Sequence, residues 1–393
     1  MKKIALIVLS LGLFISGCSI GGKEEKDNKK SNGQTVLSTY SISENHYKTG
    51  TSFEAGAARG LVNRLNTRLD IDEFETGLMR IATESFSTED YYFQSGSFLD
   101  KDTINMLVKR KRVEEEVSEE KGDKKKDKNK PPNIGLNPPL PEGPPETLEK
   151  RNAKAPLYLA NILEHNYYVA KDNNEKELGG VVIGLAMNSV HYYEEQHGYP
   201  REVQISDEVL LKQGKEMAQK ILPILQEKDP QLRDVPIVFA IYRQEGKGSL
   251  VPGSFLAYTQ VGKGDGQVED WKHIDEEYYL FPSAEADEAY REDATIVKNF
   301  NAKLADYFKD DYTAVIGKGF YQDGQLKEMK LEIPVKFSGK SDIIAFTQFV
   351  GGNVMHYFPN YVKVQVTIKS INRPEAIIIR DVKQDEPLMK ILN

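Results

Sequence analysis

The chain has 393 residues, of which 39% are hydrophobic, 28% are charged and one is a cysteine. This length exceeds that of an ordinary single domain, so we expect two domains. The net charge of -8 argues against a nucleic-acid partner, because phosphate binding normally needs a basic excess. A lone cysteine cannot form an intramolecular disulfide, so packing has to hold the fold together.

The first residues have the pattern of an export signal, which we place at residues 1–17. Lys2 and Lys3 are followed by the apolar segment 4–15 and by the small pair Ser16 and Gly17. The apolar segment is shorter than the roughly 20 residues that a membrane-spanning helix needs. It is therefore expected to be removed with the signal peptide.

Cys18 directly follows this signal, and Ile15-Ser16-Gly17-Cys18 resembles the lipobox of bacterial lipoproteins. In such signals the thiol is modified with diacylglycerol, and signal peptidase II then cleaves before the cysteine, here between Gly17 and Cys18. The resemblance implies two kinds of partner, the lipoprotein-processing enzymes and the lipid bilayer to which diacylglyceryl Cys18 attaches. The alternative is an ordinary secreted protein with a chance cysteine.

Behind the cysteine, residues 18–35 are rich in Gly, Ser and Lys and are expected to form a flexible tether. A small N-terminal α+β domain is expected at residues 36–112. Phe74, Leu78, Ile81 and Ala82 recur there at helical spacing. Residues 88–112 predict a short strand, a Gly turn and a helix capped by Asp100 or Asp102.

Residues 113–154 are predicted to link the domains. An acidic cluster, a basic cluster and a Pro-rich stretch follow one another here, and none has the apolar content that a core requires. We therefore expect a solvated, semi-rigid spacer. The alternatives are a ligand for a partner domain or a contact with anionic wall polymer.

The larger C-terminal domain is expected at residues 155–393. Asp323-Gly324 predicts a tight hairpin, and Pro223 is expected to kink or end a helix that Ser206 or Asp207 caps. We expect a mixed or antiparallel sheet with packed helices, which makes the fold class α+β. The elements expected are a helix leading into a strand at 155–170, a buried strand at 178–193, the helix at 206–229, a strand at 234–244, one long helix at 283–311, and strands at 361–371 and 375–382.

The apolar positions of the long helix at 283–311 are expected to share one face, which would pack on the sheet. These positions are Ala289, Ile296, Phe300, Leu304 and Phe308.

No sequence motif of a hydrolase, a metalloprotease or a nucleotide-binding loop is present. Ser118 and Lys121 fit S-x-x-K, but they lie in the charged linker, so the match is attributed to coincidence. We predict no catalytic residue and no cofactor.

The best metal-ligand cluster is formed by His191, Glu194, Glu195 and His197, which would partly share a face if the segment were helical. A solvated helix end or loop is the more common outcome of such a sequence, so no metal site is predicted. Gly262–Gly266 is expected to form a turn before Trp271.

Four tyrosine pairs could line a sugar or peptide groove. In a strand, however, each pair places one ring on either face. The pairs are at 91–92, 167–168, 192–193 and 278–279.

Several strings in chain order make the sequence resemble the CamS family of Gram-positive lipoproteins, the staphylococcal sex-pheromone precursors. They include AARGL, FETGLMRIA, LDKDTINMLVKRK, LGGVVIGLAMNSVHYY, VPGSFLAY and INRPEAIIIRDV, in addition to the lipobox. The resemblance implies a two-domain α+β body, anchored by lipid on the extracellular face of the cell membrane.

The resemblance also implies that an apolar heptapeptide is released from the signal peptide and acts as a pheromone that induces plasmid conjugation. In this chain the peptide would consist of Leu11, Gly12, Leu13, Phe14, Ile15, Ser16 and Gly17. Gly17 stands where the family's peptides end in Ala or Ser.

The sequence thus favours a non-enzymatic, membrane-anchored surface lipoprotein whose body has an unknown envelope ligand and whose signal peptide yields a pheromone. The first alternative is a lipoprotein that binds a solute or an envelope polymer. The second is a cell-envelope hydrolase, whose carboxylates could not be selected among 60 Asp and Glu residues.

Overall fold

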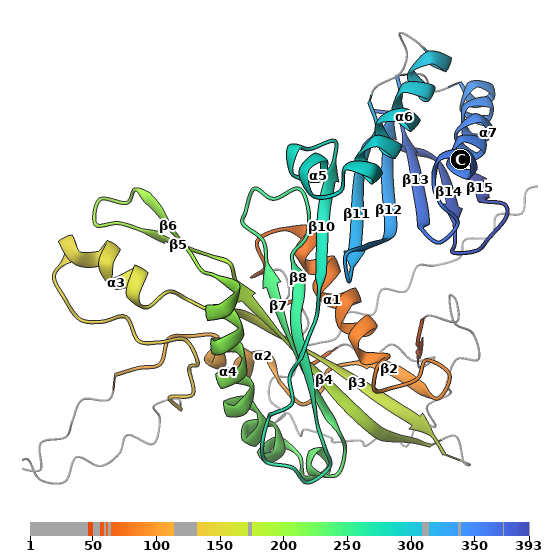
Figure 1. Cartoon of the computed structure of the whole chain (residues 1–393). Coiled ribbons are helices and arrows are strands. Elements are labelled where there is room, and N and C mark those ends of the chain that lie inside the picture. The colour runs from red at the N-terminus through yellow and green to blue at the C-terminus, as the bar shows by residue number, and fades with distance from the viewer. Residues whose placement is uncertain are drawn as a thin grey trace, which may run out of the picture. The chain divides into compact units, whose positions relative to one another are not determined.

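A computed structural model of the chain describes residues 46–49, 56–58, 60–61, 64–113, 132–171, 175–308, 314–336, 339–371 and 373–392. These residues form two large mixed sheets and a short hairpin, with helices packed on the sheets (Figure 1). The predicted α+β fold class is confirmed.

The first sheet has seven strands, and its order is β1-β2-β3-β4-β7-β8-β9. The pairs β1–β2 and β4–β7 are parallel, and the other pairs are antiparallel. The strands are β1 (Lys48–Thr49), β2 (Tyr91–Ser95), β3 (Leu159–Ala170), β4 (Lys176–Asn188), β7 (Ile237–Gln244), β8 (Ser254–Val261) and β9 (Lys272–His273).

Helices cover both faces of this sheet. Val181, Ile183 and Leu185 of β4 belong to the core beneath helix α4 (Asp207–Lys228). The alternate residues Val182 and Ala186 pack in the core beneath helix α1 (Arg68–Ala82). Residues buried on both faces explain why the central strands are almost continuously apolar.

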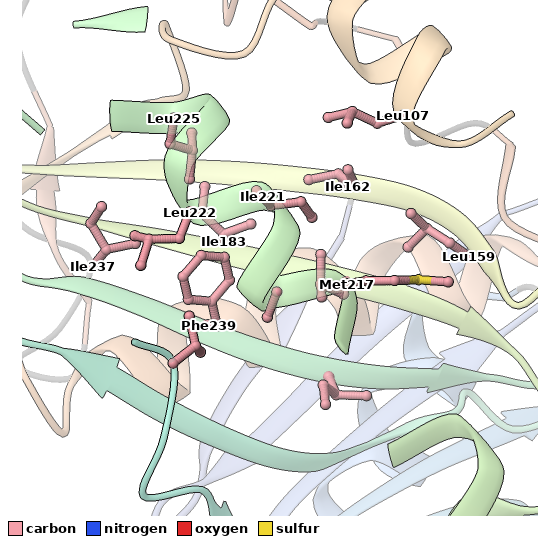
Figure 2. Close-up of a cluster of buried hydrophobic side chains, with 14 of the residues drawn as sticks. Leu107, Leu159, Ile162, Ile183, Met217, Ile221, Leu222, Leu225, Ile237 and Phe239 are labelled. Carbon is pink, nitrogen blue, oxygen red and sulfur yellow. The ribbon is translucent and has the colours of Figure 1, made fainter. Parts of the chain in front are cut away.

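Figure 2 shows the α4 side of this core. Met217, Ile221, Leu222 and Leu225 of α4 lie over the strands that carry Ile183 and Phe239. Leu107 of helix α2 (Lys101–Leu107) and Ile162 of β3 extend the same cluster. The core of the first sheet therefore includes residues from both sides of the predicted linker.

The second sheet has six strands in the order β10-β11-β12-β13-β14-β15, of which only the pair β12–β13 is parallel. Three helices, α5 (Ala284–Ala289), α6 (Arg291–Phe308) and α7 (Lys340–Tyr357), contribute to its core. The strands are β10 (Glu276–Phe281), β11 (Ile316–Gln322), β12 (Gln325–Pro334), β13 (Lys363–Lys369), β14 (Pro374–Arg380) and β15 (Leu388–Ile391).

Several predicted elements are confirmed. Asp323 and Gly324 join β11 to β12 with φ values of 53° and 69°, the left-handed conformations that a two-residue hairpin turn requires. Asp100 caps α2, since its carboxylate accepts the Thr103 N–H at 2.8 Å. Ser206 occupies the predicted N-cap position of α4, but its side chain makes no capping hydrogen bond.

The predicted helix at the start of residues 155–170 is wrong, because these residues lead directly into the twelve-residue strand β3. The region at 178–193 also differs from the single strand predicted. It contains β4 and, after Ser189, strand β5 (Val190–Glu194), which pairs with β6 (Pro200–Gln204). In both regions, residues buried on two faces remove the alternation that identifies a strand.

Pro223 does not end α4, which continues to Lys228. Ile221, Leu222 and Leu225 around it are fully buried, so their packing offsets the lost backbone hydrogen bond. The single helix predicted at 283–311 is also wrong. It is divided at Tyr290, whose φ of -136° and ψ of 60° are not helical, and Ala289 is exposed.

Residues 132–154 differ from the solvated spacer that their composition predicts. Asn137 is buried, and its side chain hydrogen-bonds to Val108 and Leu159, while Ile134 and Leu136 pack on the first core. The 3-10 turn Pro145–Thr147 and helix α3 (Leu148–Lys154) follow. The average composition of this Pro-rich stretch is polar, so it does not reveal that a few of its apolar residues pack on the core.

The two sheets comprise residues 48–273 and 276–391, so their bounds differ from those of the predicted domains at 36–112 and 155–393. Arg80 of α1 connects them. Its Nε and Nη2 lie 3.0 and 2.9 Å from the two carboxylate oxygens of Glu276, at the start of β10. Within the part of the chain that the structure describes, no helix is long and apolar enough to cross a membrane.

Candidate functional site

The residues predicted for lipidation, cleavage and peptide release, Leu11 to Cys18, lie outside the described residues. The predicted signal peptide, the tether at 18–35, and Ser118 and Lys121 also lie outside them. The described residues belong to the body of the protein.

The segment that carries His191 and His197 is a β-hairpin and not a helix. His191 is buried, and its Nε2 lies 3.0 Å from Oδ1 of Asn152. Burial, together with the charge of Arg110, lowers the pKa of His191 to about 4. Glu195 instead pairs with Arg201 at 3.0 Å. In the described ranges, no three His, Cys, Asp or Glu residues are placed to hold a metal.

Gly262–Gly266 forms the predicted turn. The Asp265 N–H donates to the Gly262 carbonyl at 3.1 Å, and Gly264 has a φ of 80°. Gln219 of α4 donates to the Gly266 carbonyl, so the turn is tied to the helix. These contacts give the loop a structural role.

The tyrosine pairs place their rings on opposite faces, as expected for strands. Tyr167 is fully buried against Phe86, whereas Tyr168 is only half-buried. Tyr278 packs on Phe320, while Tyr279 contacts the rings of Tyr290 and Tyr321. The pairs therefore do not form a continuous aromatic groove.

A separate depression lies at the division between α5 and α6. It has a volume of about 600 Å³, and Tyr290, Asp293 and Tyr361 are among its lining residues. The ring of Tyr290 stacks on Tyr321 with centroids 3.7 Å apart and meets Tyr279 edge-on. Because neighbouring rings already cover Tyr290, this depression is less suited to ring stacking with a ligand.

The strongest candidate site is a cavity of about 370 Å³ beside the first half of β3. Its size falls in the range of small-molecule pockets. Four parts of the chain form its walls: residues 56–58 with 60–61, α1, the end of β2 with the following loop, and β3. The lining residues are Gly56, Ala58, Gly60, Leu61, Glu75, Met79, Phe93, Ser95, Gly96, Leu99, Ile162, Leu163, Glu164 and His165.

Glu164 holds the loop after β2 against β3. One of its carboxylate oxygens accepts the N–H groups of Ser97 and Phe98 at 2.7 and 3.0 Å, and the other accepts that of Leu99 at 2.6 Å. Gly96 is required here, because an added Cβ would lie 2.5 Å from Cβ of Glu164. This carboxylate is therefore committed to shaping the cavity wall.

Backbone hydrogen bonds connect the walls further. The Gly96 N–H donates to the Glu164 carbonyl at 3.0 Å, and the Ala57 N–H donates to the Gly96 carbonyl at 2.8 Å. These bonds connect β3 to the loop after β2, and that loop to the segment that contains Ala57. A cavity held by such connections is formed before any ligand arrives.

His165 is the second polar residue that β3 contributes. Its side chain is only 3% exposed and meets the ring of Phe93 edge-on at 4.9 Å. Burial lowers its pKa to about 3, so the imidazole is neutral at physiological pH. Nδ1 of His165 is buried and has no hydrogen-bond partner among the described residues.

Sequence reasoning missed this cavity. The available signal was the run of polar residues Glu164, His165 and Asn166 within an otherwise apolar strand. Buried polar residues in such a run need partners or a function. The position of Glu164 and His165 in one cavity with Glu75 and Met79 depends on tertiary pairing, which a local pattern does not show.

Comparison with known proteins found a match to the family model described as CamS sex pheromone cAM373 precursor, over residues 53–386. The chain is similar to the structure of the C-terminal domain of the sex pheromone staph-cAM373 precursor from Staphylococcus aureus. The identity is 32% and the TM-score 0.71, with coverage of 85% of this chain and 99% of that chain.

The chain is also similar to the sex pheromone precursor from Lactobacillus salivarius subsp. salivarius UCC118. Here the identity is 26% and the TM-score 0.77, with coverage of 90% of this chain and 98% of the other. No curated protein matches the sequence.

Proposed function

Because the chain belongs to the CamS family, whose model matches residues 53–386, we propose that it is a surface lipoprotein and the precursor of a peptide pheromone. The family match is the observation that carries this proposal. The lipobox at Ile15–Cys18 supports it independently, because it lies outside the matched residues.

In this proposal Cys18 carries diacylglycerol, whose two acyl chains hold the body on the extracellular face of the cell membrane. Each buried methylene contributes about 0.8 kcal/mol to membrane binding, so two chains anchor a protein stably whereas one does not. Residues 18–35 would serve as the tether between the lipid and the body.

Signal peptidase II would cleave between Gly17 and Cys18, and trimming of the released peptide would give Leu-Gly-Leu-Phe-Ile-Ser-Gly, residues 11–17. The two similar structures are those of sex pheromone precursors, which supports this assignment. The signalling activity would then belong to the part of the chain that the mature protein loses.

We assign no reaction to the body. A pair of carboxylates is the usual centre of glycoside hydrolysis, and the buried carboxylates of Asp70, Glu164 and Glu276 are engaged by other groups of the fold. Asp70 accepts the Tyr242 O–H and the N–H groups of Glu245 and Gly253, each at 3.0 Å. Glu276 pairs with Arg80. These contacts support structural roles for all three.

Metabolic labelling with radioactive palmitate tests the anchor. We expect label on the wild-type protein, none on the Cys18→Ala variant, and unchanged labelling of the matched control Ser19→Ala. Globomycin, which inhibits signal peptidase II, should cause the uncleaved precursor to accumulate. Label that persists on Cys18→Ala, or an unlabelled wild type, would contradict the anchor.

A further inference from the structure

Helix α7 presents an uncharged face to solvent. The helix lies with α6 on one face of the second sheet (Figure 1), and its inner side contributes fully buried Phe346, Val350 and Val354 to the core. Its outer side forms a continuous stripe at helical spacing, which we call the outer stripe: Ser341, Ile344, Ala345, Gln348, Gly352 and Met355. None of these six residues is charged, and all except half-buried Met355 are exposed. Since a surface helix normally carries charged residues on its solvent side, this stripe has the character of a contact surface.

Apolar side chains border the outer stripe on both flanks. Ile344 and Met389 of β15 are each 43% exposed, and Met389 lies against the helix, because a Cβ added to Gly351 would be 2.5 Å from its sulfur. On the other flank, Tyr307 of α6 stacks on Phe349 with ring centroids 4.0 Å apart and stays 49% exposed. Removing these side chains from water would stabilise a complex formed over α7.

The outer stripe is complementary to itself when its direction is reversed. Ala345 lies three residues before Gln348, and Gly352 lies four residues after it. In two antiparallel copies of α7 related by a two-fold axis near Gln348, Ala345 of one copy therefore meets Gly352 of the other, and Ile344 meets Met355. A Cβ added to Gly352 would meet no atom within 4 Å, so another helix can approach closely at this point.

The ends of α7 favour the same antiparallel arrangement. Asp342 lies in the first turn and His356 in the last turn, on the same flank of the outer stripe, and both are exposed. Antiparallel pairing places Asp342 of one copy beside His356 of the other, where the imidazole N–H donates to the carboxylate, and the symmetry repeats this contact. It also aligns opposite ends of the two helix dipoles. A parallel pair would instead place like ends together.

From this arrangement we propose that the outer stripe of α7 binds the outer stripe of a second copy of the chain, as a two-fold symmetric pair of antiparallel helices. This interaction surface belongs to the body and is separate from the proposed release of a signal-derived peptide.

The size of the surface indicates a weak dimer. A helix of 18 residues is about 27 Å long, so its outer face offers less than the roughly 800 Å² per partner of a standard complex. We therefore expect a dissociation constant of about 100 µM in solution. The proposed lipid anchor would raise the effective concentration of the chains by holding them on one surface. The pairing of the helices does not depend on that anchor.

Sedimentation velocity and disulfide cross-linking of the purified full chain test the pairing without the anchor. In a Cys18→Ser background no native thiol remains. This chain should be mostly monomeric at about 20 µM and mostly dimeric at about 500 µM. Added Gln348→Cys should give a disulfide-linked dimer on mild oxidation, because the residue lies near the two-fold axis. Lys212→Cys, at an exposed position of α4, is the matched control and should give none.

The variant Ala345→Lys tests whether association uses the outer stripe. It should keep the chain monomeric at about 500 µM, because two buried charges would enter the interface. Lysine is a good helix former, so the fold should persist, and circular dichroism would show it. If this variant does not fold, Gln348→Glu replaces it, since like charges would then meet across the axis. Ala153→Lys, exposed on α3, should associate as the parent chain does.

A charge exchange tests the antiparallel direction. Asp342→Lys should weaken the dimer about fivefold, and adding His356→Asp should restore its affinity to within about twofold of the parent chain, because opposite charges then meet again. The proposal is overturned if the chain is monomeric at every concentration, if Ala345→Lys associates as the parent does, if Gln348→Cys forms no cross-link in a chain that associates, or if the exchange fails to restore the affinity.

Discussion

At the scale of single residues, the most unusual environment is that of His165. The side chain lies in the interior of the first sheet, against Phe93, and burial lowers its pKa to about 3. In the unfolded chain a histidine titrates near 6.5. Between about pH 3 and 6.5, His165 is therefore protonated in the unfolded state and neutral in the folded state. This difference makes the free energy of unfolding depend on pH.

This leads to a prediction for stability below neutral pH. As the pH falls from 7 to 5, the unfolded chain takes up a proton at His165 and the folded chain does not. The free energy of unfolding should therefore decrease by about 2 kcal/mol on account of this residue, and decrease further toward pH 3. Buried His191, whose pKa is also lowered, acts in the same direction.

Urea unfolding of His165→Leu at pH 7 and pH 5 measures the effect. The variant should lose about 2 kcal/mol less between the two pH values than the wild type. His273→Leu, at an exposed position, should behave as the wild type does. Glu75 and Glu276, whose pKa values are raised, oppose the trend equally in both proteins. An identical pH dependence in His165→Leu and the wild type would refute the burial effect.

At the scale of elements, the end of α7 depends on a residue distant in sequence. Arg380 of β14 is 1% exposed. Its guanidinium donates to the carbonyls of Phe358, Pro359 and Val362 at 2.9, 2.5 and 2.9 Å. The last carbonyls of a helix and of the following turn have no intrahelical donor, so this side chain supplies one from the sheet.

Replacing Arg380 by Met should therefore destabilise the protein by about 3 kcal/mol, because several buried carbonyls would lose their donor. Equilibrium unfolding in urea provides the measurement. Arg291→Met, which removes an exposed arginine, should change the free energy of unfolding by less than about 0.5 kcal/mol. A change equally small in Arg380→Met would mean that water replaces the guanidinium.

How far the elements can be predicted from the sequence depends on whether their signals are local. The Asp323-Gly324 turn, the Asp100 cap and the apolar stripe of α1 are local, and all three predictions are confirmed. The course of α4 through Pro223 and the division at Tyr290 follow from tertiary packing instead. The residues that pack around Pro223 and Tyr290 are distant in sequence, so a local sequence pattern does not include them.

At the scale of the whole molecule, segments far apart in sequence meet at an ion pair between the two sheets and at the cavity beside β3. Arg80 joins α1 to β10 through a bidentate pair with Glu276. The cavity brings Glu75 together with His165 across a separation that includes the predicted linker. Neither could be predicted from the sequence, since each depends on how the strands are ordered in the sheets.

The functional assignment depends on two parts of the chain. The family match covers the body, at residues 53–386. The proposed anchor and peptide, at residues 11–18, depend on the lipobox and on what the family implies. A test of the central proposal therefore has to detect the peptide itself.

Mass spectrometry of culture supernatant provides this test most directly. We expect a peptide with the mass of Leu-Gly-Leu-Phe-Ile-Ser-Gly, residues 11–17, from cells that express the wild-type chain. A Phe14→Tyr variant should shift that mass by one oxygen, and Cys18→Ala should abolish the peptide. Supernatant without any fragment of residues 4–17, from cells whose protein is lipidated and cleaved, would contradict the proposed release of a pheromone.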